Sequence, residues 1–125
     1  MSTDFAPSHL NSASGAKLAI RYLPATGKAK GIIHIHHGLA EHSARYERFA
    51  TALSKAGYHA FAHDHRGHGA TTADDAPLGT FARNDGLQVV LSDMLAVNQH
   101  IKSQTPDLPL IYFGHSMGGI LGLNY

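Results

Sequence analysis

The sequence predicts an α/β fold in which a mostly parallel sheet carries helices on both faces. Short, β-branched segments alternate with longer segments whose apolar residues recur at helical spacing. Their order is strand, helix, strand, helix, strand and the start of a helix, which is expected for βαβ units. Residues 31–38, GIIHIHHG, are bounded by glycines and rich in β-branched residues. Such a segment is typical of a strand in a sheet that is covered on both faces.

The first half of the chain contains two predicted strands and a helix. Apolar and polar residues alternate over residues 17–24, so we expect a strand that ends at Pro24. Residues 31–38 form the second strand. A helix of about three to four turns follows, with Ser43 as its cap and Gly57 after its last turn. The apolar face of this helix comprises Tyr46, Phe49, Ala50 and Leu53.

The second half repeats the pattern. Residues 58–64 are predicted to form a strand, and the polar residues 65–80 a long loop. A helix is expected over residues 85–103, and a strand over 108–116 leads into a new helix at Met117. The apolar positions with helical spacing in the first of these helices are Leu87, Val90, Leu91, Met94, Val97 and Ile101.

Length and composition predict one domain and exclude some classes of partner. We expect residues 1–125 to belong to a single domain, with residues 1–16 as either an initial strand or a flexible N-terminus. A net charge of +1 with 15% charged residues argues against a nucleic-acid partner. The absence of cysteine excludes disulfides and thiolate chemistry. The sequence contains no leader pattern and no apolar run of membrane length, so we expect a cytoplasmic protein.

A G-x-S-x-G motif lies where the last strand meets the last helix. Gly114, Ser116 and Gly118 form it, and such a junction makes a sharp turn that lifts the serine Oγ above the sheet. Glycine is expected on both sides because the strand and the helix crowd together there. Gly119 is expected to let the new helix pack closely. The N–H of Met117 is expected to face an oxygen bound near the serine, as half of an oxyanion hole.

A His-Gly pair follows the second predicted strand. His37 and Gly38 can turn the backbone so that the N–H of Leu39 faces the pocket of the serine, as the second oxyanion donor. We expect His37 and His115 to form hydrogen bonds with the backbone and to support these two loops. Each motif alone is also compatible with a glycine-rich turn. The position of the serine between a strand and a helix favours the catalytic interpretation.

Three ordered motifs, HHGLAEHSARY, DHRGHGATT and GHSMGG, resemble the monoacylglycerol lipase and lysophospholipase group of the α/β-hydrolase superfamily. The resemblance covers about residues 17–125. It implies the α/β-hydrolase fold, Ser116 as the nucleophile and the N–H groups of Leu39 and Met117 as the oxyanion hole. It further implies hydrolysis of carboxylic esters of single-acyl-chain lipids through an acyl-enzyme. No cofactor or metal ion is implied, and the intact enzyme is expected to contact membranes peripherally.

The second motif has a structural role in this resemblance. Asp64 and Arg66, in the loop DHRGHG, are expected to tie neighbouring loops together. Two positions depart from the group, because Ala40 stands where glycine is common and Thr71 where serine is common.

The acid and the histidine of a catalytic triad are absent after Ser116. In this fold they follow the nucleophile in the chain, but residues 117–125 contain neither a carboxylate nor a histidine. We therefore expect the N-terminal part of an α/β-hydrolase domain, truncated after the nucleophile elbow and inactive by itself. The identity of the ester and the oligomeric state stay open.

Three alternatives remain. A local histidine could replace the missing base, with His36, His37 and His115 as candidates. The chain could instead be a non-catalytic hydrolase-like binding protein. It could also be a histidine-rich metal-binding protein, although we expect no metal site because the hydrolase motifs account for these residues. The histidines considered as metal ligands are His34, His36, His63, His65 and His68.

Overall fold

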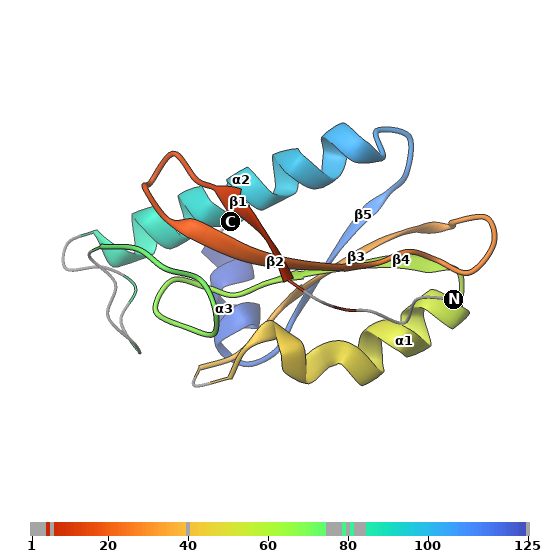
Figure 1. Ribbon diagram of the computed structural model, residues 1–125, viewed down its shortest axis with the longest axis horizontal. Helices are drawn as coiled ribbons and strands as arrows, with labels where there is room; N and C mark the ends of the chain where they lie inside the picture. Colours follow the sequence, from red (N-terminus) through yellow and green to blue (C-terminus); the bar gives the residue numbers. More distant parts are fainter. Residues whose placement is uncertain are drawn as a thin grey trace.

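The computed structural model describes residues 5, 7–39, 41–74, 79, 81 and 85–124. Strands and helices alternate along most of this chain (Figure 1). In chain order the elements are β1 (Pro7–Asn11), β2 (Lys17–Leu23), β3 (Gly31–His36), the 3-10 helix η1 (Ser43–Tyr46), α1 (Glu47–Lys55), β4 (Tyr58–His63), α2 (Gly86–Gln104), β5 (Leu110–Gly114) and α3 (Met117–Asn124).

The described strands form one mixed sheet in the order β1-β2-β4-β3-β5. Strands β3, β4 and β5 are parallel, as expected, whereas β1 and β2 pair antiparallel to each other and β2 pairs antiparallel to β4. His36 of β3 lies in register with His63 of β4 and with Gly114 of β5. The parallel strands therefore end level with one another, and the loops that follow them gather at one edge of the sheet. This edge is where open α/β sheets place their ligands.

Helices cover both faces of the sheet. Figure 1 shows α1 on one side and α2 on the other. Ile33 and Ile35 pack in the core on the α1 side, while Ile32 packs with Val97 and Ile101 of α2. Successive side chains of β3 thus point alternately into the hydrophobic cores on the two faces of the sheet. This explains why residues 31–36 are uniformly buried. None of the helices in the described part combines the length and apolar character that a membrane crossing requires.

One open alternative is resolved and one expected detail is wrong. Residues 1–16 contain β1, which the sequence left open as a strand or a flexible terminus. Ser43 does not cap a helix but begins η1, and the actual N-cap, His42, makes no side-chain capping bond. The Ser43 N–H donates to Oδ1 of Asp64 at 2.7 Å, and its Oγ accepts from Nε of Arg21 at 3.0 Å. Tertiary partners therefore occupy both groups that a capping serine would use.

Candidate active site

Ser116 lies on the turn that joins β5 to α3. Its backbone φ is 55°, in the left-handed region that residues with a Cβ rarely adopt. The side chain is exposed. This is the strained strand-to-helix turn that the G-x-S-x-G motif predicts, with a hydroxyl that a substrate can reach.

Glycine is required on both sides of this turn, but not at every position. A Cβ on Gly118 would lie 2.1 Å from the carbonyl oxygen of His36, and one on Gly114 would lie 2.6 Å from the carbonyl carbon of Gly118. Backbone atoms cannot move aside, so these two positions admit no side chain. A Cβ on Gly119 would meet its nearest neighbour, the carbonyl oxygen of Gly114, at 3.5 Å. This is ordinary contact, so close packing of α3 does not require glycine at position 119.

The loop after β3 lies against the serine turn. The N–H of His115 donates to the carbonyl oxygen of His36 at 3.1 Å. A Cβ on Gly38 would lie 3.1 Å from the carbonyl oxygen of His115. The N–H of Met117 is among the first of α3, where amide groups have no acceptor within the helix and favour negative charge. Leu39, the other expected donor, follows Gly38 directly. The two expected donors therefore lie on neighbouring segments, Leu39 in the loop after β3 and Met117 at the start of α3.

Glu41 connects these two loops, and sequence reasoning missed it. Its Oε1 accepts the N–H of Gly38 at 2.6 Å and the hydroxyl of Tyr46, and it lies 3.2 Å from Nδ1 of His115. Burial raises the pKa of Glu41, but the hydrogen bonds from Tyr46, Gly38 and His115 outweigh it and lower the pKa to about 2. The carboxylate is therefore ionised at neutral pH. The only sequence signal is an acid three residues after Gly38.

His37 is held by the backbone, as expected, whereas the His115 ring lies against the Glu41 side chain. Its Nε2 accepts the N–H of His65 at 2.9 Å, so the neutral ring carries its proton on Nδ1, which donates to the carbonyl oxygen of Gly38 at 2.7 Å. Burial lowers the pKa of His37. Both ring nitrogens are already engaged, so His37 has no free site for a proton from Ser116.

Other histidines lie beneath the turn, on the α2 face of the sheet. Nε2 of His34 and Nδ1 of His63 are 2.9 Å apart and hydrogen-bonded. The His36 ring stacks on that of Tyr112, whose hydroxyl donates to the carbonyl oxygen of Gly118 at 2.6 Å. Burial lowers the pKa of His34 to about 3 and also lowers those of His36 and His63. These three imidazoles are buried and neutral, and His36 is therefore not an exposed base beside Ser116.

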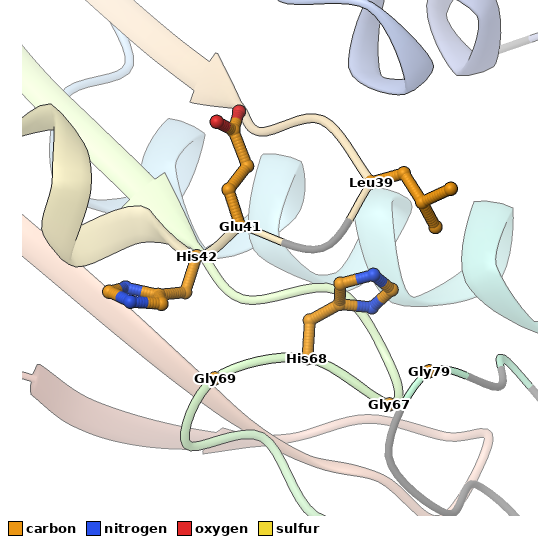
Figure 2. A pocket seen from close by; sticks show the side chains of 7 residues that line it. All are labelled: Leu39, Glu41, His42, Gly67, His68, Gly69 and Gly79. Atoms are coloured by element: carbon orange, nitrogen blue, oxygen red, sulfur yellow. The ribbon is translucent and has the colours of Figure 1, made fainter.

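A pocket of about 310 Å³ lies between the loop after β3 and the loop after β4. Figure 2 shows the His68 ring directed toward Leu39, with the Glu41 carboxylate turned toward the end of β3. Ser116 does not line this pocket, which therefore adjoins the expected oxyanion loop rather than the nucleophile. Its lining residues are Leu39, Glu41, His42, Gly67, His68, Gly69 and Gly79.

Asp64 ties three segments together, as the resemblance implies. Besides the N–H of Ser43, its carboxylate accepts the N–H of Ala70 at 2.9 Å. The hydroxyl of Thr71 donates to the carbonyl oxygen of Asp64 at 2.6 Å and accepts the N–H of Ala19 at 2.9 Å. A serine could make the same two bonds, so this contact does not depend on whether position 71 holds threonine or serine. Ala40, the other departure, lies outside the described residues.

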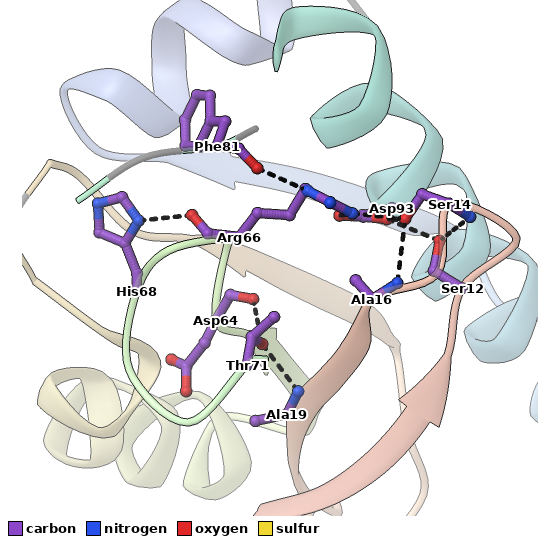
Figure 3. Close-up of polar contacts among 10 residues, drawn as sticks. All are labelled: Ser12, Ser14, Ala16, Ala19, Asp64, Arg66, His68, Thr71, Phe81 and Asp93. Carbon is purple, nitrogen blue, oxygen red and sulfur yellow. Dashed lines mark hydrogen bonds and ion pairs between the residues drawn. The ribbon is translucent and has the colours of Figure 1, made fainter. Parts of the chain in front are cut away.

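Arg66 is buried in a second network, which Figure 3 shows. Its Nε donates to the carbonyl oxygen of Phe81 at 2.7 Å, and its Nη1 donates to Oγ of Ser14 at 2.7 Å and lies 3.5 Å from Oδ2 of Asp93. Oδ1 of Asp93 accepts the hydroxyl of Ser12 at 2.6 Å. The turn between β1 and β2, the loop after β4 and helix α2 are thus joined through one buried ion pair. Asp93 was not predicted to take part.

Comparison with known proteins finds hydrolases. Residues 27–125 match the family described as serine aminopeptidase, S33. The chain is 36% identical to human monoglyceride lipase over 115 residues, which are 92% of this chain and 36% of that protein. A soluble variant of monoglyceride lipase from Saccharomyces cerevisiae superposes with a TM-score of 0.79 at 28% identity, over 100% of this chain and 39% of that one. A thermostable carboxyl esterase from Bacillus coagulans superposes with a TM-score of 0.84 at 31% identity, over 95% of this chain and 38% of the esterase chain. The chain thus spans about a third of the length of its curated relatives.

Proposed function

Because this chain belongs to the serine aminopeptidase S33 family and has the α/β-hydrolase fold, we propose that it carries the nucleophile and oxyanion hole of a serine ester hydrolase. The observation that carries this proposal is the exposed Ser116 at a φ of 55° between β5 and α3. The substrate is a carboxylic ester of a single-acyl-chain lipid, either a monoacylglycerol or a lysophospholipid. Support for a lipid ester comes from the likeness to monoglyceride lipases.

The reaction proceeds through an acyl-enzyme. Oγ of Ser116 attacks the ester carbonyl carbon and loses its proton to a base, and the carbonyl oxygen becomes an oxyanion. The N–H groups of Leu39 and Met117 hold this oxyanion, and the loss of one preorganised donor of this kind costs about 3–4 kcal/mol of transition-state stabilisation. The alcohol leaves with a proton returned by the base. Water then hydrolyses the acyl-serine to a fatty acid and restores the hydroxyl.

We propose that the base of this reaction is not one of the histidines of residues 1–125. Both nitrogens of His37 are engaged, whereas His115, whose Nδ1 lies 3.2 Å from the Glu41 carboxylate, is the local alternative. In the α/β-hydrolase fold the acid and the histidine follow the nucleophile in the chain. We therefore expect the 125-residue chain alone to hydrolyse esters no faster than its Ser116→Ala variant.

Labelling with a fluorophosphonate tests this proposal in the protein extended to the length of its relatives. We expect the probe to modify Ser116 and hydrolysis of p-nitrophenyl and monoacylglycerol esters to disappear in Ser116→Ala. Ser103→Ala is the matched control, because Ser103 is exposed at the end of α2, where its hydroxyl donates to the carbonyl oxygen of His100. Hydrolysis that persists in Ser116→Ala, or a label on another residue, would contradict the proposal. A folded protein that neither labels nor hydrolyses would favour a non-catalytic binding protein.

A further inference from the structure

Three histidines on two neighbouring strands converge beneath the serine turn. His34 and His36 point to the same face of β3 because side chains alternate along a strand. His63 of β4 lies in register beside His36. One ring nitrogen from each of the three lies within 4.8 Å of those of the other two. The sequence separates these residues into two groups, and the parallel pairing of β3 and β4 brings them together.

Several nitrogens of this histidine cluster, defined as His34, His36 and His63, have no hydrogen-bond partner among the described residues. Neither ring nitrogen of His36 has one, nor does Nε2 of His63. All three side chains are at most 2% exposed. Buried polar atoms in folded proteins are nearly always paired, and an unpaired atom points to a missing water or ion. The two unpaired nitrogens of the buried His36 ring therefore need an explanation.

We propose that the histidine cluster binds one divalent transition-metal ion. Imidazole nitrogens suit Zn²⁺, Co²⁺, Ni²⁺ and Cu²⁺, whereas Mg²⁺ and Ca²⁺ require oxygen ligands. Three histidines and a water molecule complete a tetrahedral site of a kind known for zinc. In such a site Zn–N bonds of about 2.1 Å hold the nitrogens about 3.4 Å apart. One nitrogen of each ring already lies within 4.8 Å of the other two, so binding draws the rings closer, and Nε2 of His34 and Nδ1 of His63 exchange their mutual hydrogen bond for bonds to the ion.

The surroundings of the cluster determine how an ion reaches it and how tightly it binds. A pocket of about 200 Å³ adjoins the cluster, lined by His34, Asn98, Lys102, Leu110 and Tyr112. Among the described residues, no carboxylate joins the cluster and Nε2 of His63 has no partner of the kind that usually orients a metal-bound imidazole. We therefore expect weaker binding than in structural zinc sites, with selectivity set by nitrogen donors rather than by charge.

An ion bound by the cluster would restrict the motion of the end of β3, against which the Ser116 turn packs. The carbonyl oxygen of His36 accepts the N–H of His115, the residue before Ser116. Holding the His36 ring fixes the strand end on which this turn rests. Since an ion that binds only the folded state stabilises it, Zn²⁺ is expected to raise the melting temperature of the chain.

Titration of the purified, untagged chain with CoCl₂ tests the proposal. We expect one equivalent to bind with the visible absorption bands of tetrahedral nitrogen coordination, ZnCl₂ to displace it, and MgCl₂ or CaCl₂ to have no effect. His36→Phe and His63→Phe are expected to weaken binding at least about tenfold. His9→Gln, which changes an exposed histidine on β1, should leave binding unchanged. Ser116→Ala should also bind normally, so the outcome does not depend on the proposed hydrolase function.

Histidine ring resonances of the unsubstituted chain provide a second measurement, which does not require the variants to fold. On addition of Zn²⁺ we expect the side-chain signals of His34, His36 and His63 to shift, and those of His9 and His42 to stay in place. Absence of binding, binding that survives both phenylalanine substitutions, or shifts confined to exposed histidines would overturn the proposal.

Discussion

The backbone of Ser116 combines a strained conformation with an exposed hydroxyl. A φ of 55° costs a residue with a Cβ about 1–2 kcal/mol relative to right-handed backbone. The turn is held by its surroundings, since the N–H of His115 bonds to β3 and the N–H of Ile120 donates to the carbonyl oxygen of Ser116 at 3.1 Å. The proposed nucleophile therefore occupies a position at which backbone stability favours glycine.

Removal of the Cβ at this position should stabilise the chain. We expect Ser116→Gly to raise the free energy of unfolding by about 1 kcal/mol relative to Ser116→Ala, because only glycine adopts this φ without penalty. Both variants lack the hydroxyl, so their comparison isolates the backbone. Urea unfolding followed by far-ultraviolet circular dichroism measures the difference. Equal stability of the two variants would contradict the strain assigned to the turn.

Glu41 should contribute stability that depends on pH. Its pKa is about 2 in the folded chain against an ordinary value of 4.5. A lowered pKa means that the contribution is complete above pH 4.5 and is lost as the pH falls toward 2. Glu41→Gln should therefore be less stable than the unsubstituted chain at pH 7, and the difference should shrink below pH 4.5.

Urea unfolding at a series of pH values checks this dependence. Glu47→Gln is the control, because Glu47 is the acidic residue in the first turn of α1 and is exposed. A Glu41→Gln deficit that stays constant between pH 7 and pH 3 would show that the carboxylate hydrogen bonds are not its source.

At the scale of elements, the junction of β5, β3 and α3 distinguishes two adjacent glycines. We expect Gly118→Ala to destabilise the chain by about 3 kcal/mol or more, since its Cβ would lie 2.1 Å from a backbone oxygen of β3. Gly119→Ala should be neutral or stabilising by up to about 1 kcal/mol, because its nearest contact is 3.5 Å and alanine favours helix. Thermal melts of the two variants give the comparison, and similar destabilisation by both would refute the packing argument.

Elements with a strong local pattern could be predicted from the sequence. The apolar periodicity of α2 and the β-branched run of β3 placed both within a few residues of their observed bounds. β1 could not be assigned, because Pro7–Asn11 lacks regular alternation and gains its hydrogen bonds from β2. The cap assigned to Ser43 was wrong for a similar reason. Ser43 bonds to Asp64, which lies 21 residues away in the chain, and local sequence does not reveal such a partner.

The part of the candidate site that could be predicted is the turn around Ser116, because its steric requirements appear in the sequence as a glycine motif. The glycines around Ser116 signal a steric requirement, so Gly114 and Gly118 could be identified from spacing alone. The roles of Glu41 and Asp93 could not be predicted. The sequence does not distinguish a solvent-exposed carboxylate from one that accepts hydrogen bonds inside the protein. Asp93 meets Ser12 across 81 residues, and no local pattern encodes that contact.

At the scale of the whole molecule, β5 lies at the edge of the described sheet. It pairs with β3 on one side, and its Ile111 and Phe113 are 44% and 37% exposed. An apolar strand edge of this kind favours pairing with another chain. We therefore expect the 125-residue chain to associate with itself at high concentration.

A charge on this edge should reduce self-association. Ile111→Lys is expected to shift the chain toward the monomer in sedimentation velocity experiments, because a lysine on an edge strand opposes pairing. Leu95→Lys removes a similarly exposed apolar side chain, 48% exposed on α2, but leaves the strand edge unchanged. An equal effect of the two substitutions would indicate general surface hydrophobicity rather than strand pairing.

The stacked ring of Tyr112 gives the molecule an optical reporter. The chain has five tyrosines and no tryptophan, so its near-ultraviolet dichroism is dominated by a few phenols. The centroids of the Tyr112 and His36 rings are 3.8 Å apart, and the Tyr112 hydroxyl donates to the carbonyl oxygen of Gly118 in α3. A ring in such fixed, asymmetric surroundings gives a strong near-ultraviolet dichroism signal, which is lost when tertiary packing loosens. Loosening of the turn that carries Ser116 can thus be followed by spectroscopy without an introduced label.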